Sequence, residues 1–109
     1  MAHGTHDFVD DPRNASILID INGELVPRAQ ATVSVFDSGF ILGDGVWEGL
    51  RVHNGRCAFL GLHLDRLYEG AKALDMDLEV SPAELTARLE NVLKANRMHD
   101  GVHIRLMVR

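Results

Sequence analysis

Residues with complementary chemistry alternate along the segment Val46–His53. On an extended strand, successive side chains point to opposite faces, so Trp47, Gly49, Arg51 and His53 share one face. A large aromatic ring, a gap, a fixed cation and an imidazole in a row are typical of a pocket wall for an anion or a planar ligand. The alternative is that Arg51 is a surface charge facing water, and the residues support both interpretations equally.

A second candidate pair comes from a segment with helical periodicity. His63 and Arg66 are three positions apart, so on a helix they project side by side. The forked guanidinium of an arginine can bind a phosphate group bidentately. The alternative, which spacing alone favours, is an exposed Arg66 paired with Asp65 or Glu69.

Other polar residues are weaker candidates for catalysis. Asp44 and Glu48 could form a general acid/base pair, but Asp44 lies between glycines that predict a turn, and Glu48 falls on the apolar face of its strand. We therefore expect Glu48 to form a buried or interfacial ion pair. Cys57 is expected to be a small core residue. No metal site is predicted, since His3 and His6 have no further ligands nearby.

Composition limits the class of protein. The 109 residues suffice for one small domain, and 46% hydrophobic with 25% charged residues is ordinary for a soluble globular protein. A net charge of -5 without a basic run argues against nucleic-acid binding. One cysteine, no apolar leader and no membrane-length apolar run predict a soluble cytoplasmic protein without a membrane partner.

Strand signals dominate the first half of the chain, after a polar segment, residues 1–15, that we expect to be a flexible arm. Two Asn-Gly pairs, at 22–23 and 54–55, each predict a hairpin turn between strands. Alternation predicts a further strand between the hairpins, and glycines predict a loop after it. The expected strands are Ile17–Ile21, Glu24–Pro27, Ala31–Val35, Val46–His53 and Arg56–Leu60.

The second half changes to helical periodicity and then returns to alternation. A helix is predicted over Gly61–Asp75, and a second begins after Ser81, which with Pro82 and Glu84 forms a helix-start signal. Alternation predicts a strand over Val102–Val108. The predicted fold class is α+β, a two-layer domain with an antiparallel sheet and two helices on one face. Because the sequence stops inside a strand, we expect residues 16–109 to be the front part of a longer protein or one piece of a divided one.

Three segments together resemble the N-terminal domain of class IV (fold-type IV) pyridoxal-phosphate enzymes. This family includes branched-chain aminotransferases, D-amino acid aminotransferases and aminodeoxychorismate lyase. The resemblance covers about Ile17 to Arg109 and keeps the order of the family motifs. It rests on Val35–Gly55, on His63-Leu-Asp-Arg-Leu67 followed by Ala71–Leu74, and on His103-Ile-Arg-Leu106.

The resemblance implies a role for five residues. Arg66 matches the arginine that binds the phosphate of the cofactor, pyridoxal 5'-phosphate. Trp47 and Gly49 match residues that line the substrate pocket, and Arg51 and Arg105 match pocket arginines of the branched-chain type. It also implies amino acid and 2-oxo acid substrates and a homodimer of the full-length enzyme.

The sequence departs from the family pattern in two ways. Trp47 stands where tyrosine or phenylalanine is commoner, which implies a narrower pocket or a different selectivity. The family holds the cofactor on a lysine of the C-terminal domain, whereas this chain has only Lys72 and Lys94, neither in a matching motif. We therefore expect no catalytic residue and no activity from this chain alone.

The same motifs are compatible with more than one function. Glu-Gly-Leu-Arg and His-Ile-Arg favour the branched-chain type, but a D-amino acid aminotransferase, an amine transaminase or an aminodeoxychorismate lyase would share the same motifs. A non-catalytic truncated domain is a further alternative. A free-standing anion-binding module would explain Arg51 and Arg66 but not the unfinished strand.

Overall fold

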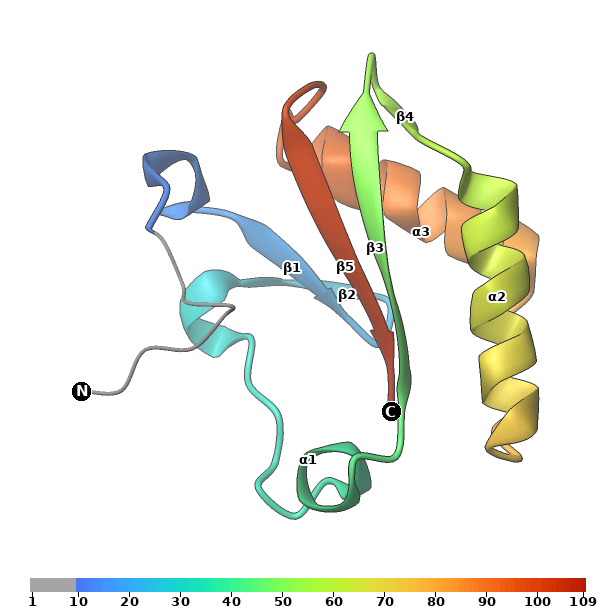
Figure 1. Cartoon of the computed structure of the whole chain (residues 1–109). Helices are drawn as coiled ribbons and strands as arrows, with labels where there is room; N and C mark the ends of the chain where they lie inside the picture. Colours follow the sequence, from blue (N-terminus) through green and yellow to red (C-terminus); the bar gives the residue numbers. More distant parts are fainter. Residues whose placement is uncertain (1–9) are drawn as a thin grey trace.

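A central strand pairs with a neighbour on each side in the computed structural model, which describes residues 10–109. Strand β3 (Val46–His53) lies between β4 (Arg56–Cys57) and β5 (Val102–Val108), and both pairings are antiparallel (Figure 1). The predicted hairpin at residues 54–55 is confirmed. The long β3–β5 register places Gly49 opposite Arg105 and Arg51 opposite His103.

A second, two-stranded sheet contains β1 (Leu18–Ile21) and β2 (Glu24–Pro27). Its turn is the other predicted hairpin, with Asn22 at φ 54° and Gly23 at φ 90°, the left-handed region that asparagine and glycine favour. The side chain of Asn96 donates to the carbonyl oxygen of Leu18 at 2.9 Å and accepts from its amide at 2.7 Å. This hairpin is therefore hydrogen-bonded to the C-terminal end of helix α3 (Pro82–Ala95), where Asn96 lies.

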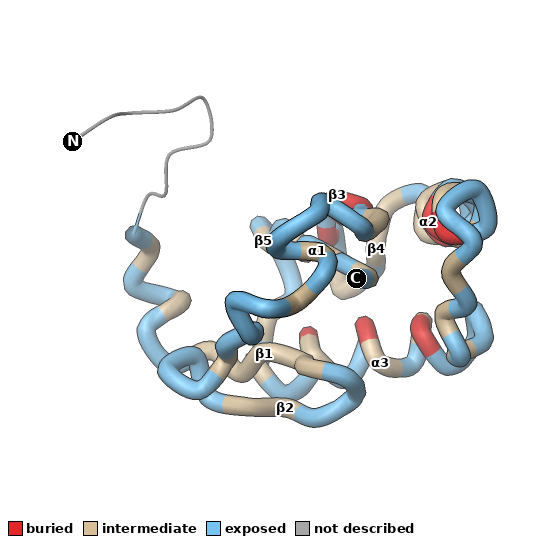
Figure 2. Tube along the Cα trace, turned by 90° about the horizontal axis from the view of Figure 1, so that it is seen from below, coloured by how far each residue is buried: buried red, intermediate tan, exposed pale blue. Residues whose placement is uncertain are grey.

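Two long helices cover one face of the sheets. Helix α2 (Leu60–Ala73) packs on β3, and α3 (Pro82–Ala95) packs on β1. The Ser81 hydroxyl accepts a hydrogen bond from the Glu84 amide at 3.1 Å, which confirms the predicted start of α3. Figure 2 shows the buried positions gathered on β3, α2 and α3, and they include Leu50, Val52, Leu64, Leu67, Ala71, Leu85, Leu89 and Leu93.

The predicted α+β fold with antiparallel pairing is confirmed, but four local predictions were wrong. Residues 31–35 form no strand, because no neighbouring strand pairs with them, and Val33 and Val35 are exposed. The strand predicted over Arg56–Leu60 ends at Cys57, before Phe59 adopts φ 54° and helix α2 begins. The strands also form two sheets rather than one.

The fourth wrong prediction concerns the glycine-rich segment, where the sequence predicted only a loop. A short helix, α1 (Ser38–Leu42), lies there. The Asp37 carboxylate caps it by accepting from the Gly39 amide at 2.8 Å, and Gly43 ends it at φ 73°.

The predicted arm, residues 1–15, is described only from residue 10, so His3 and His6 lie outside the described residues. A 3-10 helix, η1 (Pro12–Asn14), follows, and another, η2 (Arg28–Gln30), lies after β2. Within residues 10–109, no helix is long and apolar enough to cross a membrane.

Candidate functional site

A buried carboxylate links strand β3 to helix α2. Glu48 is only 3% exposed, yet it carries a charge that burial would penalise without a partner. Arg66 supplies that partner with a bidentate contact, Nε to Oε1 at 2.6 Å and Nη2 to Oε2 at 2.7 Å. The predicted buried ion pair of Glu48 is thus confirmed, whereas the suggested pairing of Arg66 with Asp65 or Glu69 was wrong.

His63 joins the same carboxylate from one turn earlier on α2. Its Nδ1 lies 3.5 Å from Oε1 of Glu48, so the helical spacing does bring His63 and Arg66 together. The hydrogen bonds from Arg66 outweigh the opposing effect of burial and hold the pKa of Glu48 below its ordinary 4.5. Glu48 is therefore a carboxylate at neutral pH and is poorly suited to act as a general acid.

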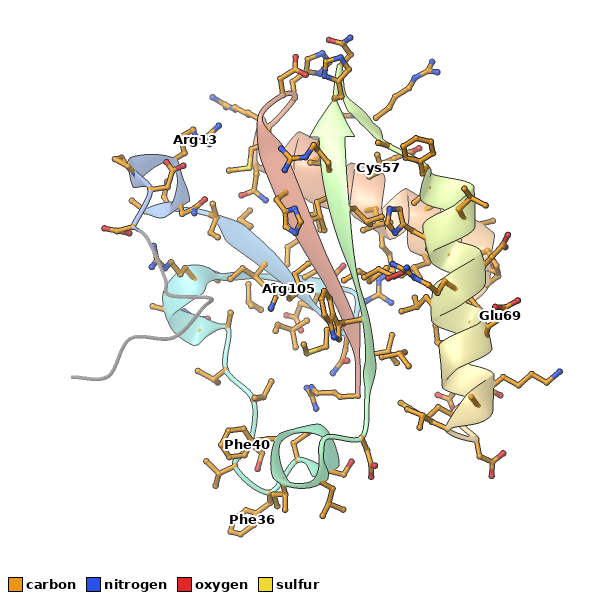
Figure 3. All side chains as sticks on the ribbon, in the orientation of Figure 1. Arg13, Phe36, Phe40, Cys57, Glu69 and Arg105 are labelled. Carbon is orange, nitrogen blue, oxygen red and sulfur yellow. The ribbon has the colours of Figure 1, made fainter. Side chains whose placement is uncertain are left out.

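The residues that were predicted to form a pocket wall lie on one exposed face of the β3–β5 pair. Trp47 is 59% exposed, and the guanidinium of Arg105 lies over its ring, with Cζ 5.1 Å from the ring centroid. Arg51 is exposed on the same face of β3. Arg105, labelled in Figure 3, is exposed like Trp47, so an aromatic ring and a cation face solvent together.

The ring of His103 packs closely over Gly49. A Cβ built there would lie 3.0 Å from two atoms of the His103 ring, which leans across the strand from β5. Even an alanine would therefore push that ring away. His103 belongs to one of the sequence motifs, but we predicted no role for it. Its position beside Gly49 follows from the register of β5 against β3.

The predicted site residues do not all gather at one place. Trp47, Gly49, Arg51 and Arg105 belong to the solvent-facing side of the sheet, whereas Arg66 contacts Glu48 on the side that α2 covers. A groove of about 720 Å³ lies between β1, α3 and β5, and of these five residues only Arg105 lines it. The five predicted residues thus lie on two different faces of the sheet, and the described part of the chain does not bring them together.

An unpredicted contact fixes the segment beside the wall. Arg109 donates from Nη1 to the Asp37 carboxylate that caps α1. A Cβ at Gly39 would lie 2.7 Å from the Cβ of Arg109, so α1 is held close against the end of β5. Sequence spacing carries no signal for this pair, because the two residues are far apart in the chain.

The other candidates show no catalytic arrangement. Cys57 is half-buried, and burial, together with the negative charge of Glu90, raises the pKa of its thiol, so the reactive thiolate is disfavoured. Within the described part of the chain, no group of histidine, cysteine and acidic side chains could hold a metal ion. Lys72 and Lys94 are both exposed, on α2 and α3 respectively.

Comparison with known proteins assigns the class. The model of the family "Amino-transferase class IV" matches residues 45–109, which contain β3, the Glu48–Arg66 pair and β5. The chain therefore belongs to the class IV aminotransferase family, as its motifs implied.

The relatives are longer proteins. Branched-chain-amino-acid aminotransferase-like protein 1 of Arabidopsis thaliana is 45% identical over 95 residues, which are 87% of this chain and 17% of the relative. D-alanine aminotransferase of Bacillus licheniformis is 39% identical over 80 residues, 73% of this chain and 28% of the relative. The chain thus spans less than a third of either one.

A solved structure shares the fold. The branched-chain aminotransferase from the thermophilic archaeon Thermoproteus uzoniensis, solved with norvaline, matches with a TM-score of 0.78 and 27% identity. The match covers 84% of this chain and 32% of that structure, so the solved protein is also much longer than this chain.

Proposed function

We propose that this chain is the part of a pyridoxal-phosphate-dependent aminotransferase that anchors the cofactor phosphate and forms a wall of the substrate pocket. The reaction would transfer an amino group between an amino acid of the branched-chain type and a 2-oxo acid. The main support is Arg66, whose guanidinium is held by Glu48 at one side while the side chain stays 71% exposed.

The residues present fit a phosphate group. Arg66 is fixed against the protein and still accessible, which suits a bidentate contact to phosphate oxygens. Pyridoxal phosphate, when bound, supplies the electron sink that amino-group transfer requires. This chain provides no residue suited to carry the cofactor covalently, since both lysines are on exposed helix surfaces.

The sheet wall suits the substrate. Trp47 offers apolar surface for an aliphatic side chain, and the guanidinium groups of Arg51 and Arg105 are suited to a carboxylate. The His103 ring occupies the space beside Gly49, so His103 would border a substrate bound on this face. The branched-chain name of the Arabidopsis relative supports this substrate class.

A D-amino acid substrate is the second candidate, because D-alanine aminotransferase is among the relatives. Assays of the natural protein that contains residues 1–109, with L-leucine and D-alanine as alternative donors, separate the two. Preference for L-leucine supports the branched-chain type, and preference for D-alanine supports the second candidate. Activity with neither donor would contradict both assignments.

The phosphate role is tested by Arg66→Ala in the natural protein that contains this chain. Loss of a charge-assisted bidentate contact should raise the cofactor dissociation constant roughly tenfold to a hundredfold, measured by absorbance titration with pyridoxal phosphate. Arg88→Ala is the matched control, because Arg88 lies on a different helix, α3, and pairs there with Asp20 of β1 at 2.7 Å. Unchanged affinity in Arg66→Ala would mean that Arg66 is only a structural ion-pair partner.

A homodimer of the full-length enzyme in the cytoplasm completes the proposal. Exposed apolar side chains around α1 support self-association, and a single half-buried cysteine is compatible with a reducing compartment. Sedimentation of the natural protein tests the assembly, and imaging of a tagged form in its own cells tests the compartment.

A further inference from the structure

We propose that Glu48 is a positioning residue that orients the Arg66 guanidinium for the cofactor phosphate. This inference rests on the proposed function, in which Arg66 is the phosphate anchor. It assigns a role to a carboxylate that would touch neither the phosphate nor the substrate.

Glu48 is itself fixed in place. It lies in the middle of β3, which is paired along its length with β5, and its buried neighbours on the same face are Leu50 and Val52. Its carboxylate therefore cannot move far without disturbing the packing of the sheet against α2. Among the described residues, no buried side-chain nitrogen or oxygen lacks a hydrogen-bond partner, so this buried charge is fully paired.

The contact to Arg66 fixes the plane of the guanidinium. Two short parallel hydrogen bonds use Nε and Nη2, so the guanidinium can neither rotate nor swing freely. The end of the fork formed by Nη1 and Nη2 remains available for a second anion. Within residues 10–109, Arg66 has no other hydrogen-bond or ion-pair partner, and most of its side chain is exposed.

The preorientation of the Arg66 guanidinium and the negative charge of Glu48 have opposite effects on the affinity for phosphate. An unrestrained arginine loses rotamer freedom when it binds a ligand, and a fixed guanidinium avoids that cost. The negative charge of Glu48, in contrast, weakens the attraction of the site for phosphate. His63 contacts the same carboxylate and offsets part of that charge when it is protonated. Removing the charge of Glu48 therefore shows which effect is larger. The affinity for phosphate falls if preorientation dominates and rises if charge dominates.

The test is Glu48→Gln in the natural protein that contains this chain. A glutamine keeps the shape but presents an NH2 group to one of the two guanidinium donors, so the bidentate contact is lost. We expect the dissociation constant for pyridoxal phosphate to rise roughly twofold to tenfold. The dissociation constant for pyridoxal, which has no phosphate, should stay unchanged. Tighter binding of pyridoxal phosphate would show that charge dominates and would overturn the inference.

Two controls separate positioning from general destabilisation. Asp20→Asn breaks the Asp20–Arg88 pair on the other sheet and should leave the affinity for both ligands unchanged. In the Arg66→Ala background, Glu48→Gln should change the affinity for pyridoxal phosphate no further, because its effect acts through Arg66. An equal loss for both ligands, or an additive loss in the double variant, would contradict the positioning role.

The same variants also separate this inference from the proposed function. If Arg66→Ala leaves the affinity for pyridoxal phosphate unchanged, the proposed phosphate role fails and the positioning role fails with it. If Arg66→Ala weakens binding and Glu48→Gln does not, only the positioning role fails.

A measurement without the glutamine variant covers the case in which Glu48→Gln does not fold. In the unaltered protein, the Arg66 Nε–H should give a slowly exchanging NMR signal that shifts on titration with inorganic phosphate. Glu48→Asp keeps the charge but shortens the side chain, so the same signal should exchange faster and phosphate should bind more weakly. A phosphate response unchanged by Glu48→Asp would overturn the inference.

Discussion

At the scale of single residues, Glu48 has the least ordinary environment in the described chain. It is the only charged residue there that is buried, and it faces a helix that brings two basic side chains to it. A buried carboxylate of this kind stabilises a fold only while both its charge and its partners are present. Its titration should therefore be visible in the stability of the protein.

We predict that Glu48 contributes to an acid-dependent loss of stability. Its pKa is lower in the folded protein than the 4.5 of an ordinary glutamate, so the folded state binds this proton less readily than the unfolded state. The stabilisation is present above pH 4.5 and is lost as the pH falls through the lower folded pKa. Urea denaturation at a series of pH values should show this slope.

Glu48→Gln provides the comparison for that slope. The glutamine variant should be less stable at neutral pH, and its stability should depend less on pH below 4.5. The remaining slope is expected from other carboxylates with lowered pKa values, including Asp20 beside Arg88. Parallel slopes for the two proteins would show that the titration of Glu48 is not linked to folding.

At the scale of elements, helix α3 depends on its first turn. Ser81 accepts a hydrogen bond from the Glu84 amide, and Pro82 begins the helix. Leu85, in the same first turn, is buried in the hydrophobic core. The cap matters beyond the helix itself, because Asn96 at the other end of α3 holds the β1–β2 hairpin.

Ser81→Ala should lower the free energy of unfolding by about 1 kcal/mol, because the Glu84 amide loses its partner. Chemical denaturation monitored by circular dichroism measures the change. Thr86→Ala is the control: Thr86 is half-buried on the same helix, and its hydroxyl donates to the Pro82 carbonyl oxygen without capping a free amide. A loss as large in Thr86→Ala as in Ser81→Ala would contradict the capping role.

At the scale of the whole molecule, the described chain leaves much apolar surface uncovered. Phe36 is 85% exposed and Phe40 is 68% exposed, and both project away from the sheet around α1 (Figure 3). The outer edge of β5 also has no strand beside it within the described residues. Exposed apolar patches and open sheet edges favour association.

We predict that the isolated 109-residue chain associates in a concentration-dependent way. Light scattering across a concentration series measures the association. Replacing Phe36 and Phe40 by serine should reduce it, because both side chains lie on the exposed surface around α1. Leu62→Ser, at an exposed position on α2, is the control for a general loss of apolar surface. A monodisperse monomer at high concentration would contradict the prediction.

Local sequence determined the elements whose signals act over a few residues. The two Asn-Gly turns, the capped start of α3 and the apolar stripes of both long helices depend on backbone preference and periodicity, which are properties of neighbouring residues. The alternation of Val46–His53 likewise placed Trp47, Gly49 and Arg51 on one face and Glu48 on the other. The motifs within these elements were enough to indicate the family.

Only the tertiary structure decided which partners meet. Residues 31–35 alternate as a strand does but form none, because a strand needs a neighbour that pairs with it. Arg66 had charged neighbours on its own helix and pairs instead with Glu48, because packing α2 on β3 removes that carboxylate from water and makes an uncompensated charge costly. The position of the phosphate candidate thus depends on the packing of a helix against a sheet, which spacing along the chain does not encode.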